Sequence, residues 1–192
     1  MESTAIEEHL KQVEEAMEEV KHLEKEEAKW LSYISLSTAI IAIVTALAGL
    51  YESQVTSKTI LLKNEAVLYQ GQASDQWSYY QSKGIKGHIY EVSAEVYPKQ
   101  SEEFAKKAEK YKKEQEKIKQ DAHRLEAIRD QKSAESERYY EKHHILSFAI
   151  TFLQISIAVA SISALTRNKK FWLGSLILST IGAIIGGYTL IS

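Results

Sequence analysis

The sequence predicts an all-α protein with three transmembrane helices and a long extramembrane helical hairpin that forms an antiparallel coiled coil. Two observations lead to this fold class. Nearly all charge lies in residues 1–29 and 52–142, whereas three uncharged apolar blocks lie between or after these stretches. The 192 residues also contain a single proline and no cysteine. Helices can therefore run long, and neither a disulfide framework nor a thiolate metal site is expected.

Residues 1–29 form an acidic segment with ten glutamates and four lysines. Apolar side chains recur there at alternating spacings of four and three, at Ile6, Leu10, Val13, Met17 and Val20. This spacing predicts an amphipathic helix, either solvated or part of a short self-associating coiled coil. Binding to a membrane surface is disfavoured, because helices that meet anionic lipid are usually basic.

Three segments are predicted to span a bilayer, namely residues 30–51, 144–166 and 171–192. Each holds an uncharged run long enough to cross a hydrocarbon core of about 30 Å. Interfacial belts are rich in aromatic residues, and such residues lie near the ends of the first and third segments, at Trp30, Tyr33, Tyr51, Trp172 and Tyr188. Only the basic turn 167–170 separates the last two segments, so these are predicted to form an antiparallel pair.

The orientation in the membrane is predicted from the turn 167–170, which carries three positive charges and no acid. Short basic loops stay in the cytoplasm. We therefore expect the turn and the N-terminus to be cytoplasmic, with the hairpin and the C-terminus on the opposite side. No signal peptide is expected, because residues 1–29 are acidic and lack a basic region followed by an apolar one.

Each predicted span has one face of small and weakly polar side chains at spacings of three and four residues. In the first span this face is Ser35, Thr38, Ala42, Thr45 and Gly49. In the second it is Ser147, Thr151, Gln154, Ala158 and Ser161. In the third it is Ser175, Ser179, Gly182, Gly186 and Thr189. Small residues let helices approach closely in lipid, so these faces predict a packed bundle or its oligomer, with a hydrated pore as the alternative.

Gln154 is the only strongly polar side chain in any of the three spans. Polar groups inside a membrane often mark a functional site. An amide can equally tie two helices together through hydrogen bonds. Both interpretations stay open from the sequence.

Residues 52–143 are predicted to fold back at Pro98, because the residue before a proline disfavours helix and Ser101 with two following acids suits a helix start. The outgoing arm has a seam at Ala66, Tyr69, Ala73, Gln76 and Tyr80, which we expect to continue through Ile85, Ile89, Val92 and Val96. The returning arm has a seam at Phe104, Ala108, Tyr111, Gln115, Ile118, Ala122 and Leu125.

A polar-aromatic band occupies about three turns of the outgoing arm. It consists of Asp75, Gln76, Trp77, Tyr80, Gln81, Lys83 and Lys86. Such a band can form the polar layer that sets the register of the hairpin. It can also bind a lipid headgroup or a partner helix. The structural role is the simpler of the two.

The run from Ala73 to Trp77, followed by Tyr80, Gln81, Lys83 and Lys86, resembles a bacterial family of membrane proteins, the domain of unknown function 4337. The order of segments is also similar, with an acidic N-terminal helix, one span, a long charged middle and two further spans. The resemblance implies a bacterial membrane protein. It supplies no activity and no catalytic residues.

The residues that could carry chemistry do not form a known site in the sequence. His143 and His144 are adjacent and point about 100° apart on a helix, so they cannot chelate a metal as an i,i+4 pair would. Gly84 and Gly87 lack the strand and lysine of a phosphate loop, and no nucleophile elbow is visible. We therefore expect neither an enzyme nor a cofactor or metal. A net charge of −2 gives no argument for nucleic acid.

These observations predict a homo-oligomeric structural or interaction protein of the bacterial cytoplasmic membrane, with the lipid bilayer and its own copies as partners. A protein or a headgroup is a possible ligand of the hairpin. The alternative is an oligomeric ion channel or pore whose hairpins form a vestibule.

Overall fold

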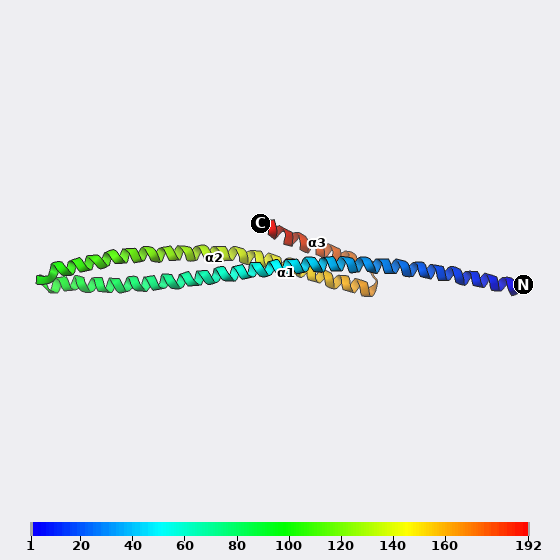
Figure 1. The fold of residues 1–192 in the computed structure, drawn as a ribbon, viewed down its shortest axis with the longest axis horizontal. Coiled ribbons are helices and arrows are strands. Elements are labelled where there is room, and N and C mark those ends of the chain that lie inside the picture. Colours follow the sequence, from blue (N-terminus) through cyan, green and yellow to red (C-terminus); the bar gives the residue numbers. More distant parts are fainter. Residues whose placement is uncertain (1, 192) are drawn as a thin grey trace. The chain divides into compact units, whose positions relative to one another are not determined.

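The computed structural model describes the backbone of residues 2–191 and the side chains of residue 11 and residues 15–189. Its elements are α1 (Glu2–Val96), the short 3-10 helix η1 (Pro98–Gln100), α2 (Ser101–Thr166) and α3 (Lys169–Ile191), as Figure 1 shows. The described backbone contains helices and no strand. The predicted all-α class is therefore confirmed.

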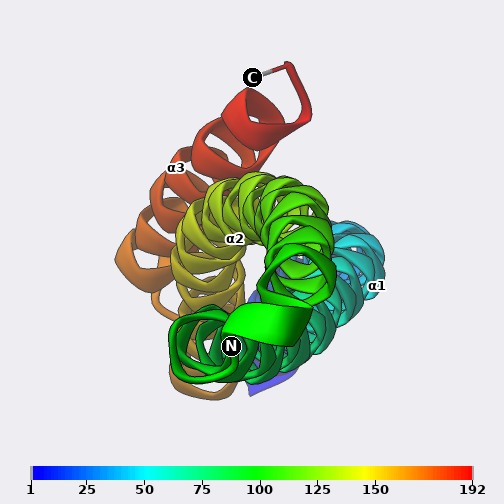
Figure 2. The same ribbon diagram turned by 90° about the vertical axis from the view of Figure 1, so that its left-hand side faces the viewer.

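The contacts divide the chain into two units, residues 53–143 and residues 1–52 together with 144–192. The first unit is a helical hairpin. Its arms, residues 53–96 of α1 and 101–143 of α2, lie side by side in Figure 1. Figure 2 has the turn of the hairpin toward the viewer and shows the two arms curving around each other.

The hairpin turns at Tyr97, whose backbone is not helical (φ −118°, ψ 81°), and Pro98 opens η1. The Tyr97 N–H donates to the Ser93 carbonyl at 3.0 Å, and the Gln100 N–H donates to the Tyr97 carbonyl at 3.0 Å. Proline costs nothing here, because the first residues of a helix have N–H groups without helical partners. α2 follows at once with Ser101, Glu102 and Glu103.

The two arms meet along a seam with alternating spacings of four and three residues, and every seam residue is buried or half-buried. On α1 the seam is Val55, Thr59, Leu62, Ala66, Tyr69, Ala73, Gln76, Tyr80, Lys83, Gly87, Tyr90 and Ala94. On α2 it is Phe104, Ala108, Tyr111, Gln115, Ile118, Ala122, Leu125, Arg129, Lys132, Ser136, Tyr139 and His143. This is the heptad pattern of a coiled coil. Ala73 and Ala122 are both 0 % exposed, so small residues occupy tightly packed positions of the seam.

The predicted continuation through Ile85, Ile89, Val92 and Val96 is wrong, because these side chains are 58–62 % exposed. Four- and three-residue steps from Tyr80 lead instead to Lys83, Gly87 and Tyr90. The ring of Tyr90 stacks on Tyr111 with the centroids 5.7 Å apart. The four apolar side chains lie about half a turn around the helix from Gly87.

The second unit brings together the first apolar segment of α1, residues 144–166 of α2 and α3. Its buried apolar residues include Ile34 and Ile41 of α1 and Leu146, Ala149, Leu153 and Ala160 of α2. The Trp172 indole N–H on α3 donates to Ser37 Oγ on α1 at 3.1 Å. Among the described residues, three helices are long and apolar enough to cross a membrane, as judged by length and composition.

The N-terminal seam was predicted on residues 1–29. The side chains of Ile6, Leu10 and Val13 lie outside the described residues. Met17 and Val20 are 55 % and 54 % exposed. α1 continues through this segment and the first apolar block without a break, from Glu2 to Val96.

A capped turn joins α2 to α3. Asn168 Oδ1 accepts a hydrogen bond from the Lys170 N–H at 3.0 Å, which is the side-chain cap that favours a helix start. Ser163 Oγ donates to the Asn168 carbonyl at 2.9 Å. Arg167 adopts a positive φ of 52°, the left-handed conformation in which many helices end. α3 consequently begins inside the predicted turn, at Lys169.

Candidate functional site

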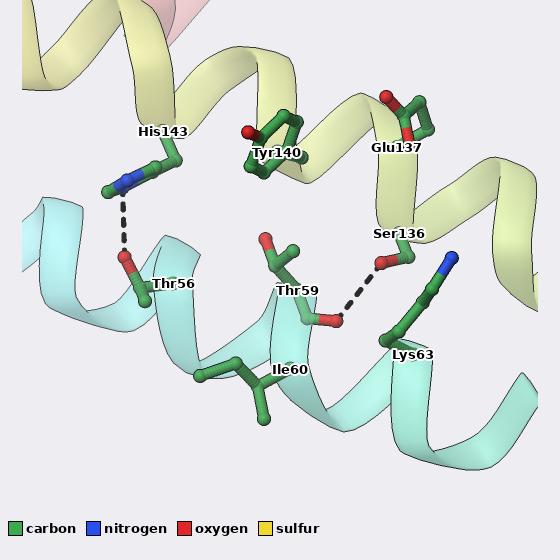
Figure 3. Close-up of a pocket in the computed structure, with 8 residues that line it drawn as sticks. All are labelled: Thr56, Thr59, Ile60, Lys63, Ser136, Glu137, Tyr140 and His143. Atoms are coloured by element: carbon green, nitrogen blue, oxygen red, sulfur yellow. Dashed lines mark hydrogen bonds between the residues drawn. The ribbon is translucent and has the colours of Figure 1, made fainter. Parts of the chain in front are cut away.

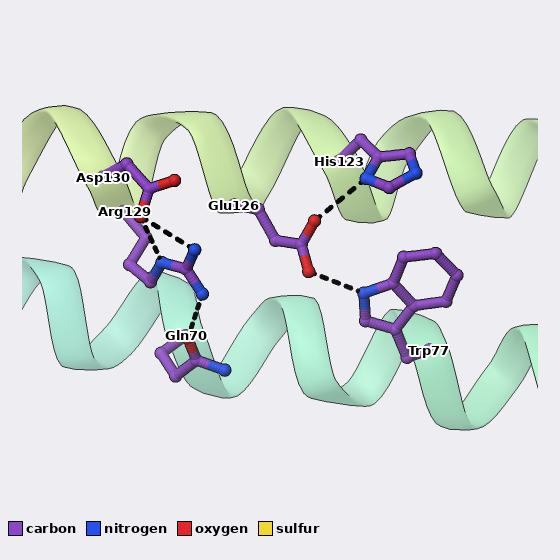
Figure 4. Close-up of polar contacts among 6 residues, drawn as sticks. All are labelled: Gln70, Trp77, His123, Glu126, Arg129 and Asp130. Carbon is purple, nitrogen blue, oxygen red and sulfur yellow. Dashed lines mark hydrogen bonds and ion pairs between the residues drawn. The ribbon is translucent and has the colours of Figure 1, made fainter.

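Trp77 anchors the polar-aromatic band to the opposite arm (Figure 4). Its indole N–H donates to Glu126 Oε1 at 2.9 Å, and the other carboxylate oxygen lies 2.9 Å from His123 Nδ1. The rings of Trp77 and His123 meet edge to face at 5.1 Å. The hydrogen bond from Trp77, followed by that from His123, holds the pKa of Glu126 below its ordinary value of 4.5. Both arms are thereby joined at one level.

Lys83 forms a second cross-arm contact. Its ammonium group lies 2.7 Å from Glu114 Oε2, and only 16 % of its side chain is exposed. The same nitrogen lies 5.1 Å from the ring centroids of Tyr79 and of Tyr111, within the range of cation–π attraction. The hydrogen bond that Lys83 donates to the Glu114 carboxylate is the largest cause that raises the pKa of Lys83 above its ordinary value of 10.5.

Gln115 crosses from α2 to the backbone of α1, where its Nε2 donates to the Tyr80 carbonyl at 3.0 Å. A Cβ at Gly84 would lie 2.5 Å from that Nε2. Gly84 therefore leaves room for the amide, and any larger residue would displace the Gln115 side chain.

The structure brings part of the predicted band to the arm interface and leaves the rest outside. Gln76, Trp77, Tyr80 and Lys83 are half-buried. Three members are exposed and make no hydrogen bond or ion pair among the described residues, namely Asp75, Gln81 and Lys86. The contacts of the inner members are those of a layer that sets the register of two helices.

Sequence reasoning missed Arg129, which lies on the seam of α2 and bonds to Gln70 of α1 and to Asp130 (Figure 4). Lys132, the next seam residue, forms an ion pair with Glu65 of α1 at 2.8 Å. The spacing that runs from Phe104 to Leu125 leads directly to both residues, but charged side chains do not stand out as seam residues in a hydrophobicity pattern.

A groove of about 390 Å³ lies between the arms at the end of the hairpin far from the turn (Figure 3). Thr56 Oγ1 and His143 Nδ1 share a hydrogen bond of 3.0 Å, and Ser136 Oγ donates to the Thr59 carbonyl at 3.1 Å. The charged side chains that line the groove are Lys63 and Glu137. The lining residues are Thr56, Thr59, Ile60, Lys63, Ser136, Glu137, Tyr140 and His143.

The three small-residue faces have different surroundings in the second unit. On α3 the face points inward, with Ser175, Gly182 and Thr189 buried and Ser179 and Gly186 half-buried. On α1, Thr38, Thr45 and Gly49 are half-buried, whereas Ser35 and Ala42 are exposed. On α2, the exposed members are Thr151, Gln154, Ala158 and Ser161, and the buried residues are Leu146, Ala149, Leu153, Ser156, Ala160 and Ser163.

Gly182 brings α3 close to α2. A Cβ built on Gly182 would lie 2.9 Å from the Ala149 carbonyl oxygen and 3.0 Å from Leu153 Cγ. At Gly186 the nearest atom would be the Cβ of Ala149, at 3.5 Å. Only a residue without a side chain fits the first position at this helix separation.

The exposed face of α2 consists of Thr151, Gln154, Ala158 and Ser161. One of its polar side chains has no hydrogen-bond partner among the described residues. Thr151 Oγ1 donates to the Ser147 carbonyl at 2.8 Å, and Ser161 Oγ donates to the Ile157 carbonyl at 2.9 Å. The Gln154 amide makes no hydrogen bond within the described residues. Its two donors and its acceptor therefore remain open to a partner.

A family model described as Domain of unknown function (DUF4337) matches residues 30–192. The chain belongs to this family. The match to DUF4337 covers the hairpin with its polar-aromatic band and all three apolar segments, so the resemblance inferred from residues 73–86 is confirmed. No curated protein and no solved structure matches the chain.

Among the described side chains, those of residue 11 and residues 15–189, no group of three or more His, Asp or Glu residues is placed to hold a metal ion. Three features of this DUF4337 protein could bind a ligand or a partner protein. These are the cross-arm polar layer, the groove between the arms and the exposed face of α2.

Proposed function

We propose that the protein is an integral membrane protein whose apolar helices anchor the hairpin outside the bilayer, and whose copies associate into a homo-oligomer with a structural or interaction role. The composition of the three apolar helices supports the anchoring. Burial of each hairpin arm against the other supports a rigid projecting element.

The observation that carries the association is the Gln154 amide on the exposed face of α2. In hydrocarbon, a polar group without a hydrogen-bond partner is costly, because no water can replace the partner. A second copy of the chain supplies a matching amide that both donates and accepts. The small residue Ala158, one turn further on, allows the two helices to approach closely.

Disulfide cross-linking tests this association, and the absence of native cysteine makes the readout clean. Ala158→Cys should give a covalent dimer in membranes under mild oxidation, and adding Gln154→Leu should reduce the yield severalfold. Phe148→Cys is the matched control, because Phe148 is 65 % exposed and lies about 120° around α2 from Gln154. Equal cross-linking at both cysteines, or none at Ala158→Cys, would contradict the proposed interface.

An oligomeric channel is the second candidate, because a ring of copies could turn the hydroxyls and amide of α2 toward a shared axis. A hydrated pore would let a membrane-impermeant, water-soluble thiol reagent modify Ala158→Cys, whereas a dry helix interface would protect it. Bilayer conductance that this modification blocks would favour the channel. Protection without conductance would leave the structural oligomer.

The number of subunits can be measured on the unmodified protein by native mass spectrometry from lipid nanodiscs. A monomer would exclude a pore, since three helices of one chain cannot enclose a useful channel, whereas a closed ring of four or more copies would favour one. A dimer would satisfy the Gln154 pairing and exclude the pore.

A further inference from the structure

A cavity of about 530 Å³ lies in the second unit, beside the turn between α2 and α3. Its polar lining residues are Glu26, Glu27, Lys29, Trp30, Arg167 and Lys169. Leu31 and Tyr33 add an apolar side. The cavity therefore combines a charged end with a hydrophobic one.

The charges of this cavity do not cancel. Lys29 Nζ lies 2.8 Å from Glu26 Oε1, and Arg167 Nη1 lies 2.8 Å from Glu27 Oε2. Both carboxylates are thus matched by a cation. Lys169 is a third cation and forms no ion pair within the described residues, which leaves the lining with one excess positive charge.

Trp30 gives a second and independent indication of a ligand. Its indole nitrogen is shut off from solvent and has no hydrogen-bond partner among the described residues. A buried donor without an acceptor destabilises the lipid-free protein, because the group has lost its water and gained no partner. An acceptor that enters the cavity would remove this cost, and an acceptor with a negative charge would also match the excess cation.

The position in the chain indicates where such an acceptor comes from. Trp30 directly precedes the uncharged run 31–51, and Arg167 directly follows the uncharged run 145–166. If these runs span a bilayer, as the proposed function requires, the cavity lies at the level of the lipid headgroups. Leu31 and Tyr33 can then contact the glycerol and the upper part of the acyl chains.

We infer that this cavity binds the phosphate of an anionic phospholipid, with Lys169 as its cationic partner and the Trp30 indole N–H as a hydrogen-bond donor. A phosphate oxygen accepts hydrogen bonds only, so it suits both groups. Basic pockets beside transmembrane helices are known to hold phospholipid headgroups. The inference rests on the proposed membrane location and adds the ligand class.

The test is a titration of the full-length protein in neutral detergent with phosphatidylglycerol, followed by native mass spectrometry. Lys169→Gln should raise the apparent Kd about tenfold, in keeping with the loss of one charge-assisted contact. Lys170→Gln is the matched control, because it removes the same charge from the next residue and Lys170 does not line the cavity. It should change the Kd less than twofold. Equal weakening by both variants would overturn the site in favour of general attraction to the basic turn.

Trp30→Phe separates the donor from the ring. The variant should weaken phosphatidylglycerol binding severalfold, yet leave the lipid-free protein as stable as the parent because the unsatisfied N–H is gone. Lower thermal stability of the lipid-free variant together with unchanged binding would mean that Trp30 only packs.

Two further binding experiments identify the source of the phosphate. Phosphatidylcholine, which has the same phosphate but no net charge, should bind more weakly than phosphatidylglycerol. Inorganic phosphate should not compete at concentrations similar to the lipid, and efficient competition would overturn the lipid assignment in favour of a soluble anion.

Alkaline carbonate extraction of membranes tests the membrane anchoring separately from lipid binding. Release of the protein would contradict the proposed membrane anchoring, whereas retention without a phosphatidylglycerol preference would contradict only this inference.

Discussion

At the scale of single residues, the hairpin depends on a few polar side chains that reach across to the other arm. Glu126 accepts hydrogen bonds from Trp77 and His123, and Lys83 pairs with Glu114 between two tyrosine rings. The Trp77–Glu126 and Lys83–Glu114 contacts each join one residue of α1 to one residue of α2. Since a shift by one residue would separate these partners, the contacts specify the register of the arms.

Glu126 should make the hairpin sensitive to acid. Its pKa in the folded protein is lower than the ordinary value of 4.5, so its contribution to stability is full above that value and is lost as the pH falls through the folded pKa. Emission from Trp77, measured with Trp30→Phe and Trp172→Phe in place, should shift in this range. Glu126→Gln should destabilise the hairpin at pH 7 and remove this part of the pH dependence.

Glu116→Gln serves as the control for Glu126→Gln, since Glu116 is exposed and forms no ion pair among the described residues. It should leave the acid transition of Trp77 unchanged. The same transition in Glu126→Gln and in the parent protein would show that the indole–carboxylate contact does not contribute.

At the scale of secondary-structure elements, helix separation depends on small residues. Ala73 and Ala122 lie in the seam of the hairpin without exposure, and Gly182 lies against the backbone of α2. Helices that approach this closely gain many van der Waals contacts, and they tolerate no added volume at the contact.

Gly182→Ala should therefore destabilise the packing of α3 on α2, by about 1–3 kcal/mol. The added Cβ would meet a backbone carbonyl oxygen that cannot turn aside. Gly187→Ala is the matched control, because a Cβ there has no neighbour within 4 Å, and it should be neutral or slightly stabilising. Thermal unfolding in detergent measures both variants, and equal stabilities would contradict the close approach.

At the scale of the whole molecule, the alternation of charged and apolar segments bears on the topology. The Arg167–Glu27 ion pair joins the turn after α2 to the acidic segment that precedes the first apolar run. This contact agrees with a topology that keeps both on one side of a membrane. Positive charge in a short loop favours the cytoplasmic side.

Cysteine labelling in intact cells tests this topology. Lys110→Cys, on the hairpin, should react with a membrane-impermeant maleimide in intact cells, whereas Lys170→Cys, in the basic turn, should react only after permeabilisation. Both positions are exposed, so access to the reagent is the only expected difference. The reverse pattern would contradict the orientation that the sequence predicts.

The seam of the returning arm was predictable from Phe104 to Leu125, because regular spacing and a single proline are local properties of the chain. The helical class, the turn near Pro98 and the three apolar segments have the same local origin. The contacts of the candidate site were harder to predict from the sequence. Trp77 and Lys83 were predicted as members of the polar-aromatic band. Their partners Glu126 and Glu114 were not predicted, because they lie 49 and 31 residues further along the chain.

What the sequence by itself determined is therefore the helical class, the segments and the period of their faces. Only the tertiary structure decided which face of each helix turns inward. Ile85 and Ile89 lie on the exposed outer surface of the hairpin, whereas Lys83 and Gly87 lie in its seam. Gln154 lies on the exposed side of α2, away from the buried side. The physical reason is that periodicity defines a face, whereas its burial depends on how closely a neighbouring helix can approach, and that depends on residues such as Ala73 and Gly182.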